Sequence, residues 1–380
     1  MPLTLVTGPA NARKAGVVLG AYRAALGSAE PLLVVPTRAD VDHYRRELAA
    51  GGAVFGVRVT TFGGLMGEIG RRAGVRGRAL GPIARERVAA AAIAGARLDG
   101  LAASAATPGF ARAFLALADE LEERRIEPGR WYTALRAWAA DAPDRAAYAE
   151  ELGALYGAYR DRVAALGRPD RALRDHAALD VLRTEPARWG GAPVFLYGFD
   201  DLRPVQLDAV ETLAVHAAAP VTVSLTYERG RTAFAGRGAA FQELAALATE
   251  HVELGPAEEA APALRHLERT LFEEEEGAGE RPPAGDAVLL LEGGGERAEL
   301  ELVAAHVARL LRVGGVEPEE IAVVLRSPAE RAALVEQVFG ELGVRVALER
   351  RIAAGHTALG RGLVALLRCA LADGGADDLL

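Results

Sequence analysis

Short apolar runs, each followed by a polar turn and a helical pattern, recur along this chain. Residues 3–7 (LTLVT), 32–35 (LLVV) and 194–197 (VFLY) are such runs. A helical period follows the first of them over residues 14–26, with Val17, Val18 and Tyr22 on one side. Apolar strands that alternate with helices are typical of a parallel sheet covered by helices on its faces. The pattern therefore predicts an α/β fold.

The middle of the chain has a different pattern. Between Pro82 and Trp189 the apolar positions keep a helical period, with the stripe Phe110, Phe114 and Leu121. We therefore expect a helical insertion inside the α/β domain.

A break in the pattern separates a third part. The stretch 273–285 contains four consecutive glutamates, then glycine and proline breakers, as in a linker. An apolar run at 287–291 and an amphipathic helix at 296–313 then open a second α/β unit. The expected domains are 1–80 with 190–280, the helical insertion 81–189, and the unit 286–380, which we expect to continue beyond Leu380.

Composition limits the kind of protein. The chain has 380 residues, 51% hydrophobic and 25% charged, which is typical of a globular protein of two or three domains. No stretch approaches the roughly 18 apolar residues of a membrane span, and residues 1–3 lack the basic start of a signal peptide. The single cysteine, Cys369, excludes a disulfide framework, and the seven histidines form no metal-binding motif. We expect a cytoplasmic protein with no membrane contact and no metal site in this region.

The loop after the first apolar run carries candidate chemistry. Residues 8–15 (GPANARKA) follow the spacing of the phosphate-binding pattern G-x4-G-K-[ST]. Gly8 and Lys14 keep their places, and Lys14 is the only lysine among the 44 Lys and Arg. Arg13 replaces the second glycine and Ala15 the hydroxyl that holds Mg²⁺. The loop is either a degenerate nucleotide site or an ordinary helix start that happens to contain a lysine.

A second segment also lacks residues that ATP hydrolysis requires. Residues 194–206 (VFLYGFDDLRPVQ) resemble motif II of the UvrD-like helicases, D-E-x-Q-D-x-x-x-x-Q. Tyr197 and Gly198 stand where those helicases carry the Mg²⁺-binding Asp and the Glu that activates water. Attack on a γ-phosphate loses its positioning without these two carboxylates. The positions that stay in register are Phe199, Asp201 and Gln206.

Asp200 and Asp201 leave two interpretations open. A pair of carboxylates could bind a metal ion. The placement before Pro204 favours instead a helix cap formed by Asp201.

Two further segments match the DNA-contacting motifs of the same helicases. Residues 32–38 resemble motif Ia, which implies contacts from Thr37 and Arg38 to single-stranded DNA. Residues 57–65 resemble the "TFHxL" segment, which implies contacts from its central residues, with a glycine in place of the histidine. These central residues are Thr61, Phe62 and Gly63.

Residues 320–327 (EIAVVLRS) resemble motif IV, whose arginine reaches the nucleotide in active enzymes. The implied vestigial nucleotide contacts are thus Gly8, Lys14, Gln206 and Arg326. A salt bridge is an equally open role for Arg326.

The order of these segments over nearly the whole chain resembles the N-terminal part of the AddB/RexB-like subunits, inactivated UvrD-type helicases of bacterial helicase-nucleases. The resemblance implies a RecA-like domain of the P-loop NTPase type, part of a second RecA-like domain, and a role in DNA repair and recombination. It also implies two partners, single-stranded DNA at a duplex end and an active AddA-like subunit. AddB proteins often keep an intact phosphate loop, so the changes at residues 13 and 15 put nucleotide binding in question here. We expect no cofactor in this region, with ATP and Mg²⁺ as an open alternative, and the iron–sulfur cluster and nuclease metal of the family only beyond Leu380.

Two arginine clusters are further candidates for DNA contact. The net charge of −8 requires any DNA-binding surface to be local. Basic residues interleaved with aromatics are typical of single-strand channels, but also of a solvated helix face with packing tyrosines. The first cluster is Arg71, Arg72, Arg76 and Arg78, and the second is Arg160, Arg162, Arg168, Arg171 and Arg174 with Tyr156 and Tyr159.

The sequence therefore favours a DNA-binding region that guides a single strand without hydrolysing ATP, and we expect no catalytic residue in it. A purely structural scaffold for an active helicase-nuclease partner is the alternative. A divergent ATPase would need Asp200 or Asp201 to replace the missing carboxylates and ranks last.

Overall fold

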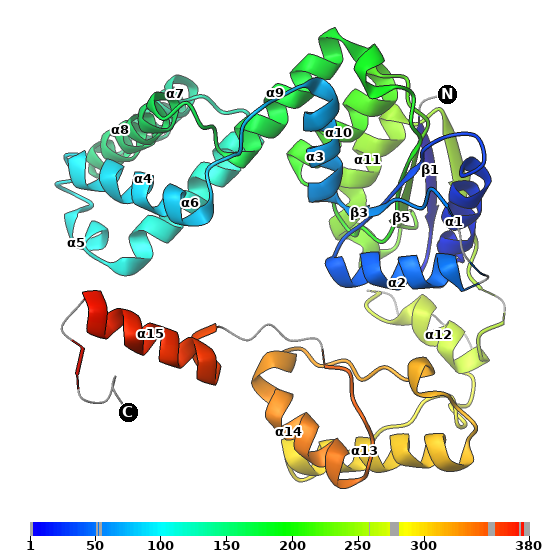
Figure 1. Ribbon diagram of the computed structural model, residues 1–380. Helices are drawn as coiled ribbons and strands as arrows, with labels where there is room; N and C mark the ends of the chain where they lie inside the picture. Colours follow the sequence, from blue (N-terminus) through cyan, green and yellow to red (C-terminus); the bar gives the residue numbers. More distant parts are fainter. Residues whose placement is uncertain are drawn as a thin grey trace. The chain divides into compact units, whose positions relative to one another are not determined.

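The computed structural model describes residues 3–50, 52, 55–257, 259–273, 281–348, 354–371 and 374–375. The chain divides into two compact units, Met1–Arg281 and Pro282–Leu380 (Figure 1). Within the described residues, no helix is both long and apolar enough to cross a bilayer. Most of the expected linker, residues 274–280, and the last five residues of the chain lie outside the described ranges.

A six-stranded sheet forms the centre of the first unit (Figure 1). All strands run parallel, in the order β3-β2-β4-β5-β1-β6. This architecture confirms the expected α/β class and fits a RecA-like domain. The strands are β1 (Leu3–Gly8), β2 (Leu32–Val35), β3 (Val59–Thr61), β4 (Val194–Leu196), β5 (Val221–Thr226) and β6 (Glu250–Glu253).

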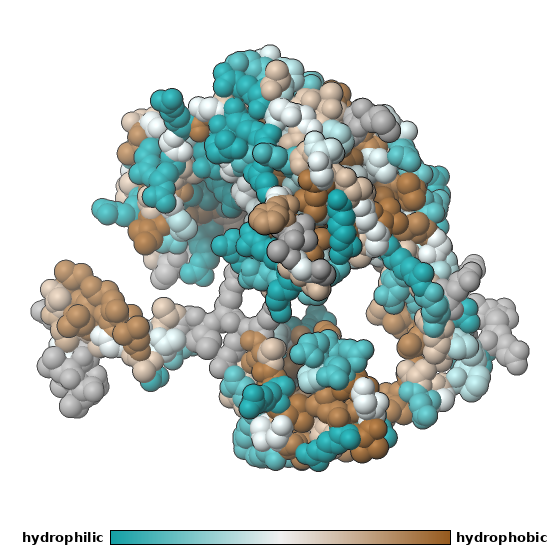
Figure 2. All heavy atoms as spheres, turned by 45° about the vertical axis from the view of Figure 1, so that its right-hand side comes forward, coloured by the Kyte–Doolittle hydropathy of each residue, from teal (hydrophilic) through white to brown (hydrophobic). Residues whose placement is uncertain are grey.

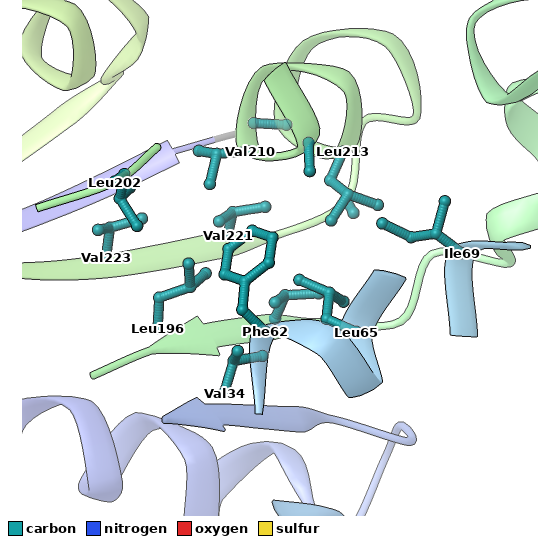
Figure 3. Close-up of a cluster of buried hydrophobic side chains, with 14 of the residues drawn as sticks. Val34, Phe62, Leu65, Ile69, Leu196, Leu202, Val210, Leu213, Val221 and Val223 are labelled. Atoms are coloured by element: carbon teal, nitrogen blue, oxygen red, sulfur yellow. The ribbon is translucent and has the colours of Figure 1, made fainter. Parts of the chain in front are cut away.

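Helices cover both faces of this sheet, so the central strands are apolar on both sides. Leu32 and Val34 of β2 pack into one hydrophobic cluster, and Leu33 and Val35 pack into another on the opposite face. The first cluster is shown in Figure 3 and the second lies under α1 and α2. The helices are α1 (Lys14–Ala25), α2 (Arg38–Ala49), α3 (Phe62–Ala73), α9 (Arg171–Thr184), α10 (Pro204–Glu211), α11 (Gly238–Leu247) and α12 (Pro262–Thr270), with short turns η1 (Pro186–Trp189), η2 (Thr212–His216) and η3 (Thr232–Arg237).

Between α3 and α9 the chain forms only helices, which have hydrophobic clusters of their own. The rings of Phe114 and Tyr159 pack edge to face in the larger cluster, with their centroids 5.5 Å apart. α9 packs against α3 and adds Leu179 and Leu182 to the cluster of the sheet. The expected boundaries of the insertion at 81 and 189 stay predictions. These helices are α4 (Pro82–Gly95), α5 (Ala102–Ala105), α6 (Pro108–Glu123), α7 (Pro128–Ala139) and α8 (Pro143–Ala165).

The second unit has a small core between α13 (Glu296–Val313) and α14 (Pro328–Glu341), where Val307 meets Phe339. The remaining elements are η4 (Pro318–Glu320), η5 (Ala354–His356) and α15 (Ala358–Leu371), whose leucines are exposed (Figure 2).

The strands expected in the second unit are not formed. No strand is assigned in the described part of this unit. Leu290 and Val324, one from each expected strand, are both 90% exposed. A strand needs a hydrogen-bonded neighbour, and sequence alone shows only that a segment is apolar enough to become one. The second RecA-like domain therefore stays a prediction.

A buried polar cluster joins α4, α6, α8 and the start of α9. Tyr159 donates a hydrogen bond to Asp170, and Arg85 Nε lies 3.0 Å from Asp170 Oδ1. Glu122 lies beside them, almost fully buried, and neither carboxyl oxygen has a hydrogen-bond partner within the described structure. Burial, and next the charge of Asp170, raise the pKa of Glu122 from 4.5 to about 8. The folded chain therefore retains the proton of Glu122 to a higher pH than the unfolded chain does.

We expect this proton to make the stability of the first unit pH-dependent. Between pH 4.5 and about 8 the unfolded chain releases the proton of Glu122 while the folded chain retains it. The free energy of unfolding therefore falls as pH rises through this window, by at most about 1.4 kcal/mol per pH unit from this group. Urea unfolding at pH 6, 7 and 8 measures how the free energy of unfolding changes with pH. Glu122→Gln removes the contribution of Glu122 to this pH dependence. An identical slope in the variant would contradict the prediction.

Candidate functional site

The carboxyl ends of all six strands meet at one edge of the sheet, because every strand is parallel to its neighbours. Ligands of open α/β sheets bind at this edge, near the point where the strand order reverses. The chain leaves β2 toward β3 and β4 toward β5, on opposite sides, and it also leaves β1 toward β2 and β5 toward β6 on opposite sides. The direction therefore reverses between β2 and β4 and again between β5 and β1. The predicted site residues of the first unit lie at this edge, at the ends of β1 and β3 and at the starts of α1, α2 and α3, while Gln206 lies in the first turn of α10.

The loop after β1 requires glycine at its first position. Gly8 has φ +155°, and a Cβ there would lie 2.7 Å from the carbonyl oxygen of Leu254 and 2.8 Å from Cβ of Ala12. Arg13, where the phosphate-loop pattern has its second glycine, adopts the left-handed conformation at φ 58°. Its exposed side chain forms an ion pair with Glu259. The loop keeps the backbone turn that a glycine would favour, although an arginine occupies it.

Lys14 is turned inward to the loop itself. Its side chain is 8% exposed, and Nζ donates hydrogen bonds to the carbonyl oxygens of Gly8, at 3.1 Å, and Pro9. The Gly8 oxygen also accepts from the N–H of Tyr227 at 3.1 Å, which ties β1 to the end of β5. Burial, and next the positive charge of Arg237, lower the pKa of Lys14. The ammonium that a nucleotide would require is thus held by the protein backbone.

The loop after β4 has no carboxylate at the two motif II positions. The ring of Tyr197 packs edge to face against Tyr44 at 5.7 Å, and Gly198 turns the chain at φ 83°. Asp200 Oδ1 accepts a hydrogen bond from Arg237 Nη2 at 2.8 Å. Within the described residues, no three His, Cys, Asp or Glu side chains gather as a metal site.

The start of α10 corrects one expectation. The helix begins after Arg203, whose N–H donates to Oε1 of Gln206 at 2.8 Å. Asp201 accepts only from the N–H of the next residue, Leu202, at 2.8 Å, so the expectation that Asp201 caps the helix is wrong. Gln206 is the capping side chain, because a Gln at the third helical position can reach back to the residue before the helix. Its predicted nucleotide contact stays a prediction.

The ends of β2 and β3 bring three of the predicted DNA-contacting residues together. Val35 and Thr61 are register partners, so the two turns lie side by side. Thr37 caps α2, where its hydroxyl accepts from the N–H of Asp40 at 3.2 Å, and Thr61 caps α3. Arg38 is exposed at the first position of α2. Two helix N-termini thus open on the same stretch of surface.

Phe62 and Gly63 occupy the first turn of α3. The ring of Phe62 is 6% exposed and lies in the hydrophobic cluster of the sheet (Figure 3). It packs edge to face on Phe199, with ring centroids 6.0 Å apart. A buried ring cannot stack on a base, so only the backbone of residue 62 remains available for a DNA contact. A Cβ at Gly63 would lie 2.6 Å from Nη2 of Arg171, at the start of α9. Sequence reasoning grouped Arg171 with a different cluster and did not place it here.

The second arginine cluster is mostly structural. Tyr156 and Tyr159 are fully buried in the core of the helical part, so they cannot stack on bases. Arg160 donates to the hydroxyl of Tyr156 at 3.0 Å, and Arg162 donates to the carbonyl of Ala91 at 3.1 Å. The packing interpretation therefore holds for these four side chains.

The first cluster is partly structural as well. Arg71 and Arg72 bond one carboxylate, that of Glu68. Burial alone would raise the pKa of Glu68, but the hydrogen bonds from these two arginines lower it to about 2. Both arginines are thus neutralised in part by a neighbour on the same helix. Arg326 lies in the second unit with an exposed side chain, and its nucleotide contact stays a prediction.

The chain resembles known subunits of one kind of enzyme. It is 28% identical to the B subunit of the ATP-dependent helicase/deoxyribonuclease of Moorella thermoacetica over 98% of this chain and 34% of that protein. It is 31% identical to the protein of the same name from Symbiobacterium thermophilum over 48% of this chain and 17% of that protein. The corresponding protein of Geobacillus kaustophilus matches at 29% over 70% of this chain and 22% of that protein. The expected AddB-like resemblance is confirmed.

No family model matches the chain. The chain spans about a third or less of the length of these curated relatives.

The geometry of the β1 loop predicts opposite effects for two glycine substitutions. Gly8→Ala introduces a Cβ into a contact that no real Cβ makes and into a backbone region that disfavours it. We expect a loss of about 2 kcal/mol or more in the free energy of unfolding. Gly16→Ala, in the exposed part of α1 with open space around it, should stabilise by about 0.5–1 kcal/mol. Urea unfolding followed by circular dichroism compares the two, and equal midpoints would contradict the strain assigned to residue 8.

Proposed function

We propose that this chain is the N-terminal region of an AddB-like subunit of a bacterial helicase-nuclease, and that it guides single-stranded DNA without hydrolysing ATP. The likeness to the named relatives supports the assembly, and the surface at the ends of β2 and β3 supports the DNA contact. The proposed role is in double-strand break repair and recombination in the cytoplasm.

The observation that carries the DNA-binding role is the pairing of Val35 with Thr61, which places two threonine-capped helix N-termini together. Helix N-termini attract phosphates through free N–H groups and the positive end of the helix dipole. Threonine hydroxyls and arginines are common phosphate donors in DNA complexes. Arg38 adds a cation to this surface, which suits a chain whose overall charge of −8 repels DNA elsewhere.

The part of this sheet edge that follows β4 is unsuitable for a DNA phosphate backbone. A groove of about 890 Å³ begins at Asp201 and runs between α6, α10 and α11. Two of its lining residues, Arg124 and Arg203, are basic, and six are acidic. The acidic residues are Glu120, Glu123, Asp201, Asp208, Glu211 and Glu243. This charge would direct a strand away from α10 and toward β2 and β3.

Two features support the absence of hydrolysis. The positions that should hold Mg²⁺ and activate water are Tyr197 and Gly198, neither of which can coordinate a metal through a carboxylate or accept a proton from water. Lys14 has its hydrogen bonds with backbone carbonyls in place of phosphate oxygens. We propose an active AddA-like subunit as the partner that supplies ATP hydrolysis, and we expect an iron–sulfur cluster and nuclease site only beyond Leu380.

The proposed role predicts that single-stranded DNA binds in a salt-dependent way and that this binding requires Arg38 at the N-terminus of α2. Fluorescence anisotropy with labelled single-stranded DNA at several salt concentrations should give a negative slope of log K against log salt. Arg38→Gln should weaken binding and reduce the slope by about 0.7, the value for one lost phosphate contact to a single strand.

Arg46→Gln is the matched control, since Arg46 is an exposed arginine near the other end of the same helix, about 12 Å away along its axis. Equal effects of the two substitutions, or no binding at low salt, would favour the structural scaffold.

The lost carboxylates predict no turnover. We expect phosphate release from ATP with Mg²⁺ and single-stranded DNA to stay at the level of a protein-free sample. Asp200→Asn should change nothing, because the carboxylate of Asp200 is paired with Arg237. Robust Mg²⁺-dependent hydrolysis that Lys14→Ala abolishes would show an active, divergent ATPase and overturn the proposal.

A further inference from the structure

Gly63 stands where the similar helicase segment carries a histidine, and the space beside it is not empty. A Cβ built on Gly63 would lie 2.6 Å from Nη2 of Arg171, 3.6 Å from its Cζ and 3.8 Å from Oγ1 of Thr61. The end of the Arg171 side chain therefore fills the position that a side chain at residue 63 would take. It does so next to the threonine that caps α3.

The guanidinium of Arg171 is held in this position and is neutralised only in part. Its Nε lies 3.7 Å from Oδ2 of Asp175, one turn along α9, a long contact for an ion pair. Asp175 also accepts a hydrogen bond from Arg174 at 3.2 Å, so one buried carboxylate serves two guanidinium groups. The side chain of Arg171 remains 62% exposed. A surplus positive charge thus faces solvent at the mouth of the α3 N-terminus.

We propose that Arg171 is a contact for a backbone phosphate of single-stranded DNA, and that the absence of a side chain at Gly63 is what admits it. The inference rests on the proposed DNA-binding function and adds to it a residue from α9. A guanidinium presents several N–H donors in a plane and matches the oxygens of a phosphodiester. The hydroxyl of Thr61 and the N–H groups of Phe62 and Gly63 complete the set of donors, whereas the N–H of Gly64 bonds Oγ1 of Thr61.

This arrangement adds a third part of the chain to the phosphate-binding surface. Arg38 follows the end of β2, Thr61 ends the neighbouring β3, and the guanidinium of Arg171 lies against Gly63, two residues after Thr61. A single strand bound at this surface would meet donors from α2, β3 and α9.

The test compares Arg171→Gln with Arg168→Gln in the anisotropy titration. Arg168 is an exposed arginine three residues earlier that lines a different groove, beside Glu127 and Arg160. We expect Arg171→Gln to weaken binding and reduce the salt slope by about 0.7, and Arg168→Gln to leave the slope unchanged. Circular dichroism melting of each variant establishes that both remain folded.

A second variant tests the position of the charge and keeps the charge itself. Gly63→Ala forces the guanidinium away from the surface, and the displaced group is the end of a flexible side chain, so the fold should tolerate it. We expect Gly63→Ala to reduce the slope as Arg171→Gln does. In the variant that carries both substitutions, the salt slope should fall no further than in either single variant, because each substitution alone already removes the contact between Arg171 and the phosphate.

The outcomes separate this inference from the function on which it rests. Equal slopes for Arg171→Gln and Arg168→Gln, with wild-type binding still sensitive to Arg38→Gln, would overturn the role of Arg171 alone. Additive losses from Gly63→Ala and Arg171→Gln would overturn the claim that residue 63 admits the guanidinium. No salt-dependent binding by the wild-type chain would overturn both the inference and the proposed function.

Discussion

The parallel pairing of the six strands is the constraint on which the rest of the first unit depends. It brings the turns after all six strands to one edge of the sheet. Successive side chains of a strand point to opposite faces, so Leu32 and Val34 join one hydrophobic cluster and Leu33 and Val35 join the other. Because both clusters must be filled at once, the register of β2 against β3 is fixed. That register is what places Thr37 and Thr61 beside each other at the proposed DNA surface.

Residues of the segments that resemble nucleotide-binding motifs have structural roles in this fold. Lys14 bonds the carbonyl oxygens of its own loop, Gln206 caps α10, and Asp200 pairs with Arg237. For Lys14 and Gln206, which are both buried, these hydrogen bonds avoid the cost of leaving a polar group buried and unpaired.

The sequence was sufficient wherever one segment decides the outcome alone. The apolar runs predicted β1, β2 and β4, and the loop after β1 begins and ends where its spacing indicated. The sequence was insufficient where the role of a side chain depends on which residues it packs against in the fold. An aromatic residue in a DNA motif and a tyrosine in an arginine cluster look alike in sequence, yet the rings of Phe62 and Tyr156 both lie in hydrophobic cores. The position of Arg171 beside Gly63 depends on the packing of α9 against α3, which no local pattern encodes.

The order of the strands also has a consequence for synthesis of the chain on the ribosome. β1 lies between β5 and β6, so Leu3 pairs with Val221 and Thr4 with Glu250. At ~5–20 residues per second, the first strand emerges some tens of seconds before either neighbour exists. The helical part has a core of its own and can fold during this interval, while the apolar β1 remains without a partner. Folding of the sheet is thus a late, long-range event, and the nascent chain is exposed to aggregation through its very first strand until β5 arrives.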